Sequence, residues 1–436
     1  MKKNIKYSAL ALALVLTMVA CGNENKTTNE DTKNEPAVTT EAESPADNEE
    51  VDKEKETKEA ETTTEVGEND EKIEKHDFSD KLKGEDGVVR WVRGHSGNLM
   101  MTMAEHNGYL EEYGLKVEQI PMQTTNESFA AVAGDQVDII SNAGTNEPLQ
   151  RIATGDDIKI FGGHMVEGGM NLIALKETEY EDITSLVGKK LADNPSDYVI
   201  SGLLLELGYD PFEDIEWNHL GSGADAVSAV KNGEVDFAML GTSMAYNSIT
   251  DPSIKVVDKK GDLMDKYSCC RMETAGRFIE NKPETTKALI KSLLRGMRDY
   301  EKDPEYASQL LADELDVPLE FVEAYTLDDG YEISPDPYYN SCVRAWAYLD
   351  ELGFLDENAK NIDLRDYIMV DLYKEALLEV IEEVGDEDPE YWDAELENFE
   401  KYNSMYFNKE EEDEYYSNLK KTIEENRAKN KAEKNS

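Results

Sequence analysis

The sequence predicts an α/β protein of two lobes with mostly parallel sheets, followed by a helical C-terminal extension. Strand and helix patterns alternate from Val88 onward, as they do when helices connect parallel strands. This alternation breaks and restarts near residue 174, and beyond Val257 the pattern is almost entirely helical. We therefore expect an export leader (1–20), a tether (21–86), the first part of lobe 1 (87–173), lobe 2 (174–265), a helical stretch (266–368) and the extension (369–436).

The first residues indicate export. Lys2, Lys3 and Lys6 form a basic start, and an apolar run follows from Ala9 to Leu16. This run is too short to span a bilayer, which takes about 20 apolar residues, so it predicts a leader peptide. Small residues then precede Cys21, an order that resembles a bacterial lipobox, in which the cysteine is lipidated and becomes the N-terminus. We predict a lipid anchor at Cys21 on the outer face of the cytoplasmic membrane; an ordinary secretory leader with an incidental cysteine is the alternative.

Residues 22–86 predict a disordered tether. They are rich in Glu, Lys, Thr and Asn and contain one aromatic residue, Phe78. Such a segment buries too little apolar surface to offset the entropy of the chain. The formal net charge of −50 argues against nucleic acid or an anionic bilayer as a partner. Because much of this charge lies in the tether and the tail, it says little about a ligand.

The first series of elements belongs to lobe 1. Apolar side chains recur on one face of residues 99–113, which predicts a helix that ends at Gly114, a residue suited to the left-handed position after a helix. Pro148 suits the first turn of another helix. We expect strands at 88–92, 115–121, 137–140, 158–161 and 171–175, and helices at 99–113, 128–133 and 147–153.

The second series repeats the pattern of the first. We expect strands at 190–192, 217–220, 235–240 and 254–257, and helices at 183–187, 198–207 and 224–230. Residues 129–140 and 226–238 have the same order: a helix, a glycine, a tight turn, and an aspartate after the first valine of a buried strand. Any α/β unit can use this order, but its occurrence at matching places favours two duplicated lobes.

Several segments resemble a known family. Residues 107–110, 113–118 and 133–138, and later 188–192 and 232–236, are similar to the lobes of ABC-transporter solute-binding proteins for nitrate, sulfonates, taurine and thiamine-pyrimidine precursors. Residues 283–289 and 303–305 resemble the helices by which such chains return to lobe 1. The resemblance covers about 88–368. It implies a type II periplasmic-binding-protein fold, with a two-stranded hinge and a cleft that closes on a ligand.

The resemblance also implies a function. We expect a small polar or anionic molecule to be captured outside the cell and delivered to the permease and ATPase subunits of an ABC importer. Two alternatives remain. Cys269-Cys270-Arg271 resembles a motif of some relatives, including thiamine-pyrimidine synthases of this fold, although those enzymes carry more cysteines. The second alternative is a lipoprotein that binds a partner at the cell surface, because the chain extends beyond residue 368, where relatives usually end.

Candidate ligand contacts follow the ends of the predicted strands, where open α/β sheets bind ligands. These loops are rich in Ser, Thr, Asn and Gly and run into helix N-termini, which favour anionic or polar groups; ordinary helix capping is the alternative for any single loop. Glu127, Glu147 and Glu167 are suited to the amine of a zwitterion such as taurine, or to solvent. The candidates are His95, Ser96, Asn98, Thr125, Asn126, Thr145, Asn146, His164, Ser196, Tyr198, Ser222, Thr242, Ser243 and Arg271.

The sequence offers little support for catalysis. It contains no Gly-x-Ser-x-Gly, phosphate-binding loop or zinc-type spacing, and its five histidines are scattered singly. We expect no cofactor and no metal. Three cysteines remain beyond Cys21; a disulfide from Cys342 to Cys269 or Cys270 and three buried thiols are both open.

The tail predicts three helices. Residues 368–384 have amphipathic spacing, and Pro389 suits the first turn of a second helix. That helix carries Trp392 and Phe399 on one side, so we expect it to pack against the lobes. A third helix begins after Asn408 and is expected to be looser and to fray toward its end.

Overall fold

The computed structural model describes residues 76–122 and 124–433. The predicted leader, Cys21 and most of the predicted tether lie outside the described residues. Residues 76–86, which we assigned to the tether, pack on lobe 1 through the short helix η1 (Ser79–Leu82). There the Phe78 ring stacks on Tyr113 with ring centroids 5.0 Å apart. The folded part therefore begins earlier than predicted. Within the described ranges, no helix is long and apolar enough to cross a membrane.

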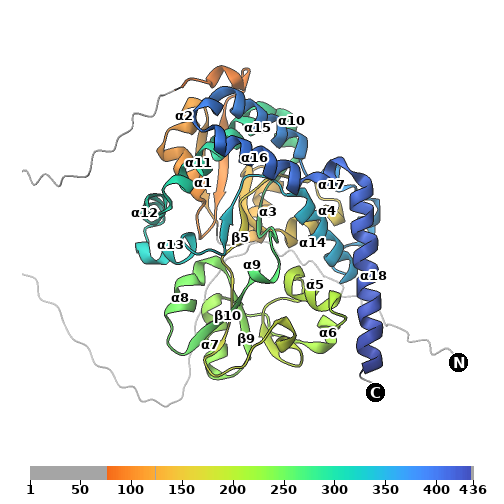
Figure 1. Cartoon of the computed structure of the whole chain (residues 1–436). Coiled ribbons are helices and arrows are strands. Elements are labelled where there is room, and N and C mark those ends of the chain that lie inside the picture. Colours follow the sequence, from red (N-terminus) through yellow and green to blue (C-terminus); the bar gives the residue numbers. More distant parts are fainter. Residues whose placement is uncertain (1–75, 123, 434–436) are drawn as a thin grey trace, which may run out of the picture. The chain divides into compact units, whose positions relative to one another are not determined.

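Lobe 1 is built on a five-stranded sheet of order β2-β1-β3-β11-β4 (Figure 1). The strands β1, β2 and β3 are parallel, and β11 runs antiparallel to both of its neighbours. The strands are β1 (Val88–Arg93), β2 (Lys116–Pro121), β3 (Ile139–Gly144), β4 (Ile158–Gly163) and β11 (Cys270–Ala275). The helices are α1 (Leu99–His106), α2 (Tyr109–Glu112), α3 (Thr125–Ala133), α4 (Asn146–Thr154), α10 (Gly276–Asn281), α11 (Pro283–Lys302), α12 (Pro304–Leu315) and α13 (Leu319–Thr326).

Two features of lobe 1 differ from the prediction. The single helix expected at 99–113 is divided into α1 and α2, because Gly108 adopts a left-handed backbone (φ 78°) between them. Strand β11 was not predicted. It carries Arg271 and Glu273, which make its sequence unlike that of a buried strand, yet both side chains are fully buried.

Lobe 2 repeats this architecture with a sheet of order β10-β6-β9-β7-β8. Here β7, β8 and β9 are parallel, and β6 runs antiparallel to both of its neighbours. The expected duplication is therefore present at the level of topology. The strands are β6 (Asn171–Leu175), β7 (Lys190–Ala192), β8 (Glu216–Trp217), β9 (Phe237–Leu240) and β10 (Ile254–Lys259). The helices are η2 (Ile183–Leu186), α5 (Tyr198–Glu206), α6 (Pro211–Asp214), α7 (Gly223–Asn232), η3 (Thr242–Met244), α8 (Ala245–Thr250) and α9 (Lys260–Leu263).

The two segments that connect the lobes lie side by side as a hinge. Strand β5 (Met165–Gly168), which also pairs with β12 (Tyr331–Ile333), leaves lobe 1, and residues 266–270 return to it. The backbone N–H of Cys269 donates to the carbonyl of Val166 at 3.1 Å. The break in the strand and helix pattern near residue 174 predicts the first crossing there, but residues 171–175 form β6 within the sheet of lobe 2. The crossing therefore lies a few residues earlier.

The C-terminal extension packs against lobe 1, as predicted. Trp392 and Phe399 on α16 are each 1% exposed, and the Tyr391 hydroxyl donates to the carbonyl of Leu294 on α11 at 3.2 Å. The buried amide of Asn403 donates to the carboxylate of Asp336 at 2.9 and 3.0 Å. The elements after β12 are α14 (Tyr339–Glu351), η4 (Glu357–Asn361), η5 (Leu364–Asp366), α15 (Val370–Val384), η6 (Gly385–Glu387), α16 (Pro389–Tyr402), α17 (Ser404–Phe407) and α18 (Lys409–Glu433).

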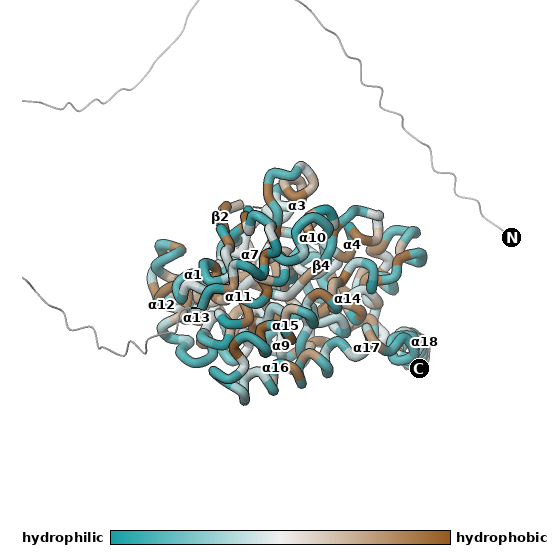
Figure 2. Tube along the Cα trace, turned by 90° about the horizontal axis from the view of Figure 1, so that it is seen from above, coloured by the Kyte–Doolittle hydropathy of each residue, from teal (hydrophilic) through white to brown (hydrophobic). Residues whose placement is uncertain are grey.

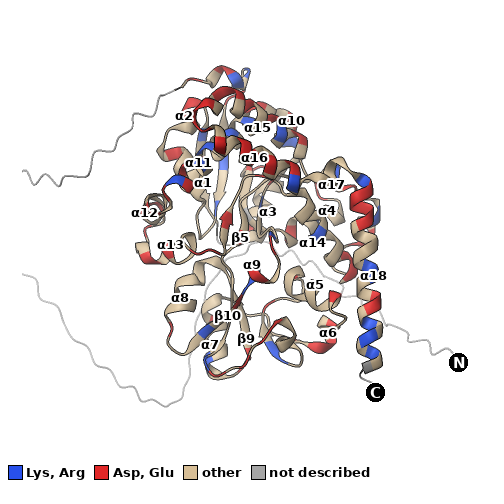
Figure 3. Cartoon of the chain, in the orientation of Figure 1, with Lys and Arg blue, Asp and Glu red and all other residues tan. Residues whose placement is uncertain are grey.

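The last helix, α18, departs from the expectation of a loose, fraying segment. It stands upright along one edge of the lobes in Figure 1 and is seen end-on in Figure 2, beside α17. Its first turn carries Glu410, Glu411 and Glu412 and its last turn Lys431, as the helix dipole favours; both charge signs also occur along the rest of the helix (Figure 3). Leu419 and Ile423 are buried, and the amides of Asn426 and Asn430 donate to the carbonyls of Glu206 and Leu207 at the end of α5 (2.7 and 3.0 Å). An element that follows lobe 1 in the chain thus also binds lobe 2.

Helix α14 makes a second contact with the same part of lobe 2. Its Tyr348 lies directly over Gly202 of α5, where a Cβ atom would stand 2.6 Å from the tyrosine ring. The Tyr348 hydroxyl donates to Glu206 at 2.7 Å. The apolar core of lobe 1 continues through these contacts into α5, since Val199 and Leu205 belong to it. The hinge is therefore supplemented by a packed contact on one side of the lobes.

Candidate functional site

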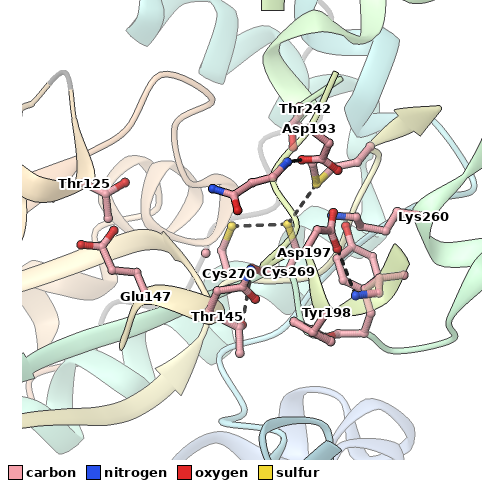
Figure 4. A pocket seen from close by; sticks show the side chains of 17 residues that line it. Thr125, Thr145, Glu147, Asp193, Asp197, Tyr198, Thr242, Lys260, Cys269 and Cys270 are labelled. Atoms are coloured by element: carbon pink, nitrogen blue, oxygen red, sulfur yellow. Dashed lines mark hydrogen bonds and ion pairs between the residues drawn. The ribbon is translucent and has the colours of Figure 1, made fainter. Parts of the chain in front are cut away.

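A cavity of about 430 Å³ lies where the two lobes and the hinge meet (Figure 4). Loops after β3 and β7, the loop after β9, the start of α9 and the returning hinge segment form its wall. The lining residues are Thr125, Gly144, Thr145, Asn146, Glu147, Met170, Asp193, Asn194, Asp197, Tyr198, Val199, Gly241, Thr242, Lys260, Tyr267, Cys269 and Cys270.

Five of the predicted contacts line this cavity. They lie at or beside the first residue of a helix that follows a strand. Open α/β sheets bind ligands at this place, beyond the ends of their strands, which we call the strand-end rule. The five are Thr125 on α3, Thr145 and Asn146 at α4, Tyr198 on α5 and Thr242 on η3. Because these five residues come from both lobes, the sequence analysis identified a part of the wall on each lobe.

The other nine candidates lie elsewhere. Asn98 and Ser222 accept backbone N–H bonds at the starts of α1 and α7, which is the capping alternative. Asn126 accepts a bond from Arg151, and the Ser96 carbonyl accepts one from Tyr325. The remaining candidates outside the lining are His95, His164, Ser196, Ser243 and Arg271.

His164 and Arg271 are buried beneath the hinge. The Arg271 guanidinium donates to the carbonyls of Met165 (3.1 Å) and Pro337 (3.0 Å), so it ties the hinge to the segment before α14. Burial and the neighbouring Arg271 charge lower the pKa of His164 to about 3. In this arrangement the neutral imidazole of His164 and the hydrogen-bonded guanidinium of Arg271 stabilise the hinge.

Hydrogen bonds across the cavity hold the lobes together. The Asn146 side chain on lobe 1 donates to the carbonyl of Ser196 on lobe 2 at 2.6 Å. The Thr242 hydroxyl donates to the carbonyl of Gly168 on the hinge at 2.5 Å. The backbone N–H of Thr145 donates to the carbonyl of Cys269 at 3.1 Å. The lobes are therefore close to one another around the cavity.

The charged residues of the cavity are concentrated on lobe 2. Asp197 caps α5 and forms an ion pair with Lys260, and both side chains are almost fully buried. Burial disfavours the Lys260 ammonium, but the carboxylates of Asp197 and Asp193 outweigh this and raise its pKa. Asp193 follows β7 directly. Burial and then the charge of Asp197 raise its pKa well above the ordinary value.

Two adjacent thiols form the hinge side of the cavity. The Sγ atoms of Cys269 and Cys270 are 3.5 Å apart, and the Met170 sulfur lies 3.9 Å from the first. The hydrogen bond from Cys270 lowers the pKa of Cys269 to about 7 and raises that of Cys270 well above its ordinary value. All three cysteines among the described residues are free thiols. No cluster of three or more metal-binding side chains occurs in the described ranges.

Sequence reasoning missed several lining residues. Asp193 follows the predicted strand at 190–192 directly, so the strand-end rule contained the signal for it. Lys260, Tyr267 and Met170 lie on the crossings between the lobes, where the sequence gives no indication of what faces the cavity.

Comparison with known proteins shows which proteins this chain is similar to. Residues 97–307 match a family model described as NMT1/THI5 like. The fold is similar to that of the periplasmic aliphatic sulphonate-binding protein SsuA of Escherichia coli, with a TM-score of 0.55, 17% identity, and coverage of 65% of this chain and 92% of that one. No curated protein sequence matches the chain.

Two further solved structures have the same fold. The alkanesulfonate-binding protein SsuA from Xanthomonas axonopodis pv. citri, bound to MOPS, gives a TM-score of 0.53 at 15% identity, covering 65% of this chain and 98% of that one. The nitrate-binding protein NrtA from Synechocystis PCC 6803 gives 0.54 at 17%, covering 67% and 89%. This chain therefore has the periplasmic-binding-protein fold, residues 97–307 are similar to the NMT1/THI5-like family model, and the resemblance predicted from the sequence is confirmed.

Proposed function

We propose that this chain is a lipid-anchored, extracytoplasmic solute-binding protein that delivers a small polar molecule to the permease and ATPase of an ABC importer. The observation that carries the proposal is the cavity of about 430 Å³ whose wall comes from both lobes and the hinge. A site built in this way closes when the lobes approach and opens when they separate, as capture and release require. The anchor rests on Cys21 and the basic, apolar leader before it.

The ligand class also belongs to the proposal. The proteins of similar structure bind sulfonates and nitrate, and the sequence resemblance adds taurine and thiamine-pyrimidine precursors. The cavity is of a size for one such small molecule. It is lined by hydroxyl, amide and carboxylate groups beside the aromatic rings of Tyr198 and Tyr267.

A cavity-filling variant tests solute capture. A Cβ atom at Gly241 meets nothing within 4 Å, and its backbone (φ −72°) suits any residue, so Gly241→Leu fills the cavity without straining the fold. We expect members of a metabolite library to raise the melting temperature of the wild-type chain and to leave Gly241→Leu unchanged. Lys189→Leu adds the same side chain on the surface of lobe 2 and serves as the control. Equal stabilisation of wild type and Gly241→Leu contradicts the proposal.

A second candidate is an enzyme that acts on a pyrimidine or related small molecule. The vicinal thiols in the cavity wall favour it, because a thiol with a pKa of about 7 is partly thiolate at neutral pH, and the thiolate is the nucleophile. The same library separates the two functions. A binding protein returns its ligand unchanged, whereas an enzyme consumes it, and that consumption stops in Cys269→Ser.

A further inference from the structure

We propose that the ligand of this cavity carries a protonated amine that contacts the carboxylate of Asp193, and that the cavity prefers such a ligand to an anion without an amine. This inference rests on the proposed function and narrows its ligand class. Two independent features of the cavity carry it. One is that two carboxylates, Asp193 and Asp197, act on a single ammonium, that of Lys260, and the other is the buried Oδ2 of Asp193, which has no hydrogen-bond partner among the described residues.

The lining has fewer positive than negative side chains. Asp197 is paired with Lys260, and the Lys260 charge also acts on Asp193. Glu147 is paired with Arg151, which lies outside the lining, at 2.7 Å. Among the described residues that line the cavity there is no arginine, and Lys260 is the one cationic side chain. Two carboxylates therefore share one ammonium, so the cavity has room for a second positive charge.

One oxygen of the Asp193 carboxylate also lacks a hydrogen-bond partner among the described residues. One of its oxygens accepts the N–H of Asn194 at 2.8 Å, but Oδ2 is buried without a partner among the described residues. A buried acceptor in this state is costly until a donor reaches it. Asp193 follows β7, close to Asp197 at the start of α5 and to Lys260 of α9. In the absence of ligand its raised pKa allows a proton to occupy this place, and a ligand ammonium supplies the same hydrogen bond together with a full charge.

Four of the hydroxyl and amide donors of the wall are already engaged. The hydroxyl of Thr145 donates to the carbonyl of Ser268, and that of Tyr198 to the carbonyl of Tyr267. The Thr242 hydroxyl and the Asn146 amide donate to the carbonyls of Gly168 and Ser196. The hydroxyl of Thr125 and the amide of Asn194, which also line the wall, donate to no partner among the described residues. The four engaged groups present lone pairs to the cavity, and these suit an ammonium, which is a pure donor.

Matched pairs of small molecules test the proposal on the full mature chain. Taurine and isethionate share a sulfonate and differ in an amine against a hydroxyl. Putrescine and 1,4-butanediol differ in the same way without the sulfonate. We expect calorimetric titration to give the amine of each pair a dissociation constant at least about tenfold lower than that of its hydroxyl partner. The hydroxyl compound cannot form the hydrogen bond between charged groups. Nitrate is expected to bind more weakly than either amine.

A substitution of Asp193 tests whether this residue causes the preference for the amine. Asp193→Asn keeps the acceptor for the N–H of Asn194 and removes the charge, so we expect it to fold and to lose the preference for the amine. Asp393→Asn, an exposed change on α16 outside the lining, is the control. Tighter binding of isethionate or nitrate than of the amines overturns the proposal and leaves solute capture intact. Binding of no member of the pairs, together with no stabilisation by the metabolite library, overturns both.

Discussion

The contact between α18 and lobe 2 makes a quantitative prediction. Ile423 is 1% exposed and belongs to the same apolar core as Val199 and Leu205 of α5. Ile423→Ala removes three buried carbon atoms and leaves a cavity between the helices. Changes of this kind cost about 2–5 kcal/mol, depending on how far the surroundings relax. We expect a loss of about 3 kcal/mol here, because Asn426 and Asn430 continue to hold the helix to the end of α5.

Urea denaturation followed by circular dichroism measures this loss. The neighbouring Glu424 is exposed on the same helix, so Glu424→Ala should change the free energy of unfolding by no more than about 0.5 kcal/mol. Hydrogen exchange of residues 409–433 adds a local measurement, with slow exchange expected in the wild-type chain. If Ile423→Ala behaves like Glu424→Ala and these amides exchange rapidly, α18 does not pack on lobe 2, and the reasoning fails.

Three further predictions concern the anchor, the extension and the cavity. Cys21→Ala should release the chain from membranes; retention in the membrane fraction contradicts the anchor. Trp392→Ala should lower the free energy of unfolding by about 3–5 kcal/mol in urea, and a loss below about 1 kcal/mol rules out a docked α16. Asp193→Asn should stabilise the ligand-free chain at pH 8 and lose that advantage at low pH; calorimetric melting at several pH values measures this.

The sign of the last effect follows from linkage. The folded-state pKa of Asp193 is raised above its unfolded value, so its ionisation opposes folding as the pH rises through the folded-state pKa. Asparagine carries no such penalty. Below the unfolded pKa both chains have a neutral side chain, and the difference disappears. A ligand ammonium competes with the same proton, so amine binding should weaken as the pH falls.

Most of the fold was predictable because its elements are local. Alternating apolar patterns gave the strands of both sheets except β11, and residues such as Gly114 and Pro389 marked helix ends. The exceptions depend on contacts between distant residues. β11 buries Arg271 beneath carbonyls from two other segments, and α18 is ordered by its contact with α5. Neither contact has a local pattern in the sequence.

The site was predictable in part for the same reason. The strand-end rule placed Thr125, Thr145 and Tyr198 on the wall because helix starts after strands are visible in the sequence. It also suggested residues such as Ser222, which caps a helix, and Arg271, which supports the hinge. Whether a polar side chain serves a cap or a cavity depends on how the lobes approach one another, which the sequence pattern does not contain.

The central claim is that the cavity between the lobes holds one small molecule. The most direct measurement is mass spectrometry of what the chain releases on denaturation, after purification without added ligand from cells that express residues 1–436. The account predicts one small amine-bearing compound in about equimolar amount, present in wild type and in Lys189→Leu and absent from Gly241→Leu. No released compound, or equal amounts from wild type and Gly241→Leu, would contradict it.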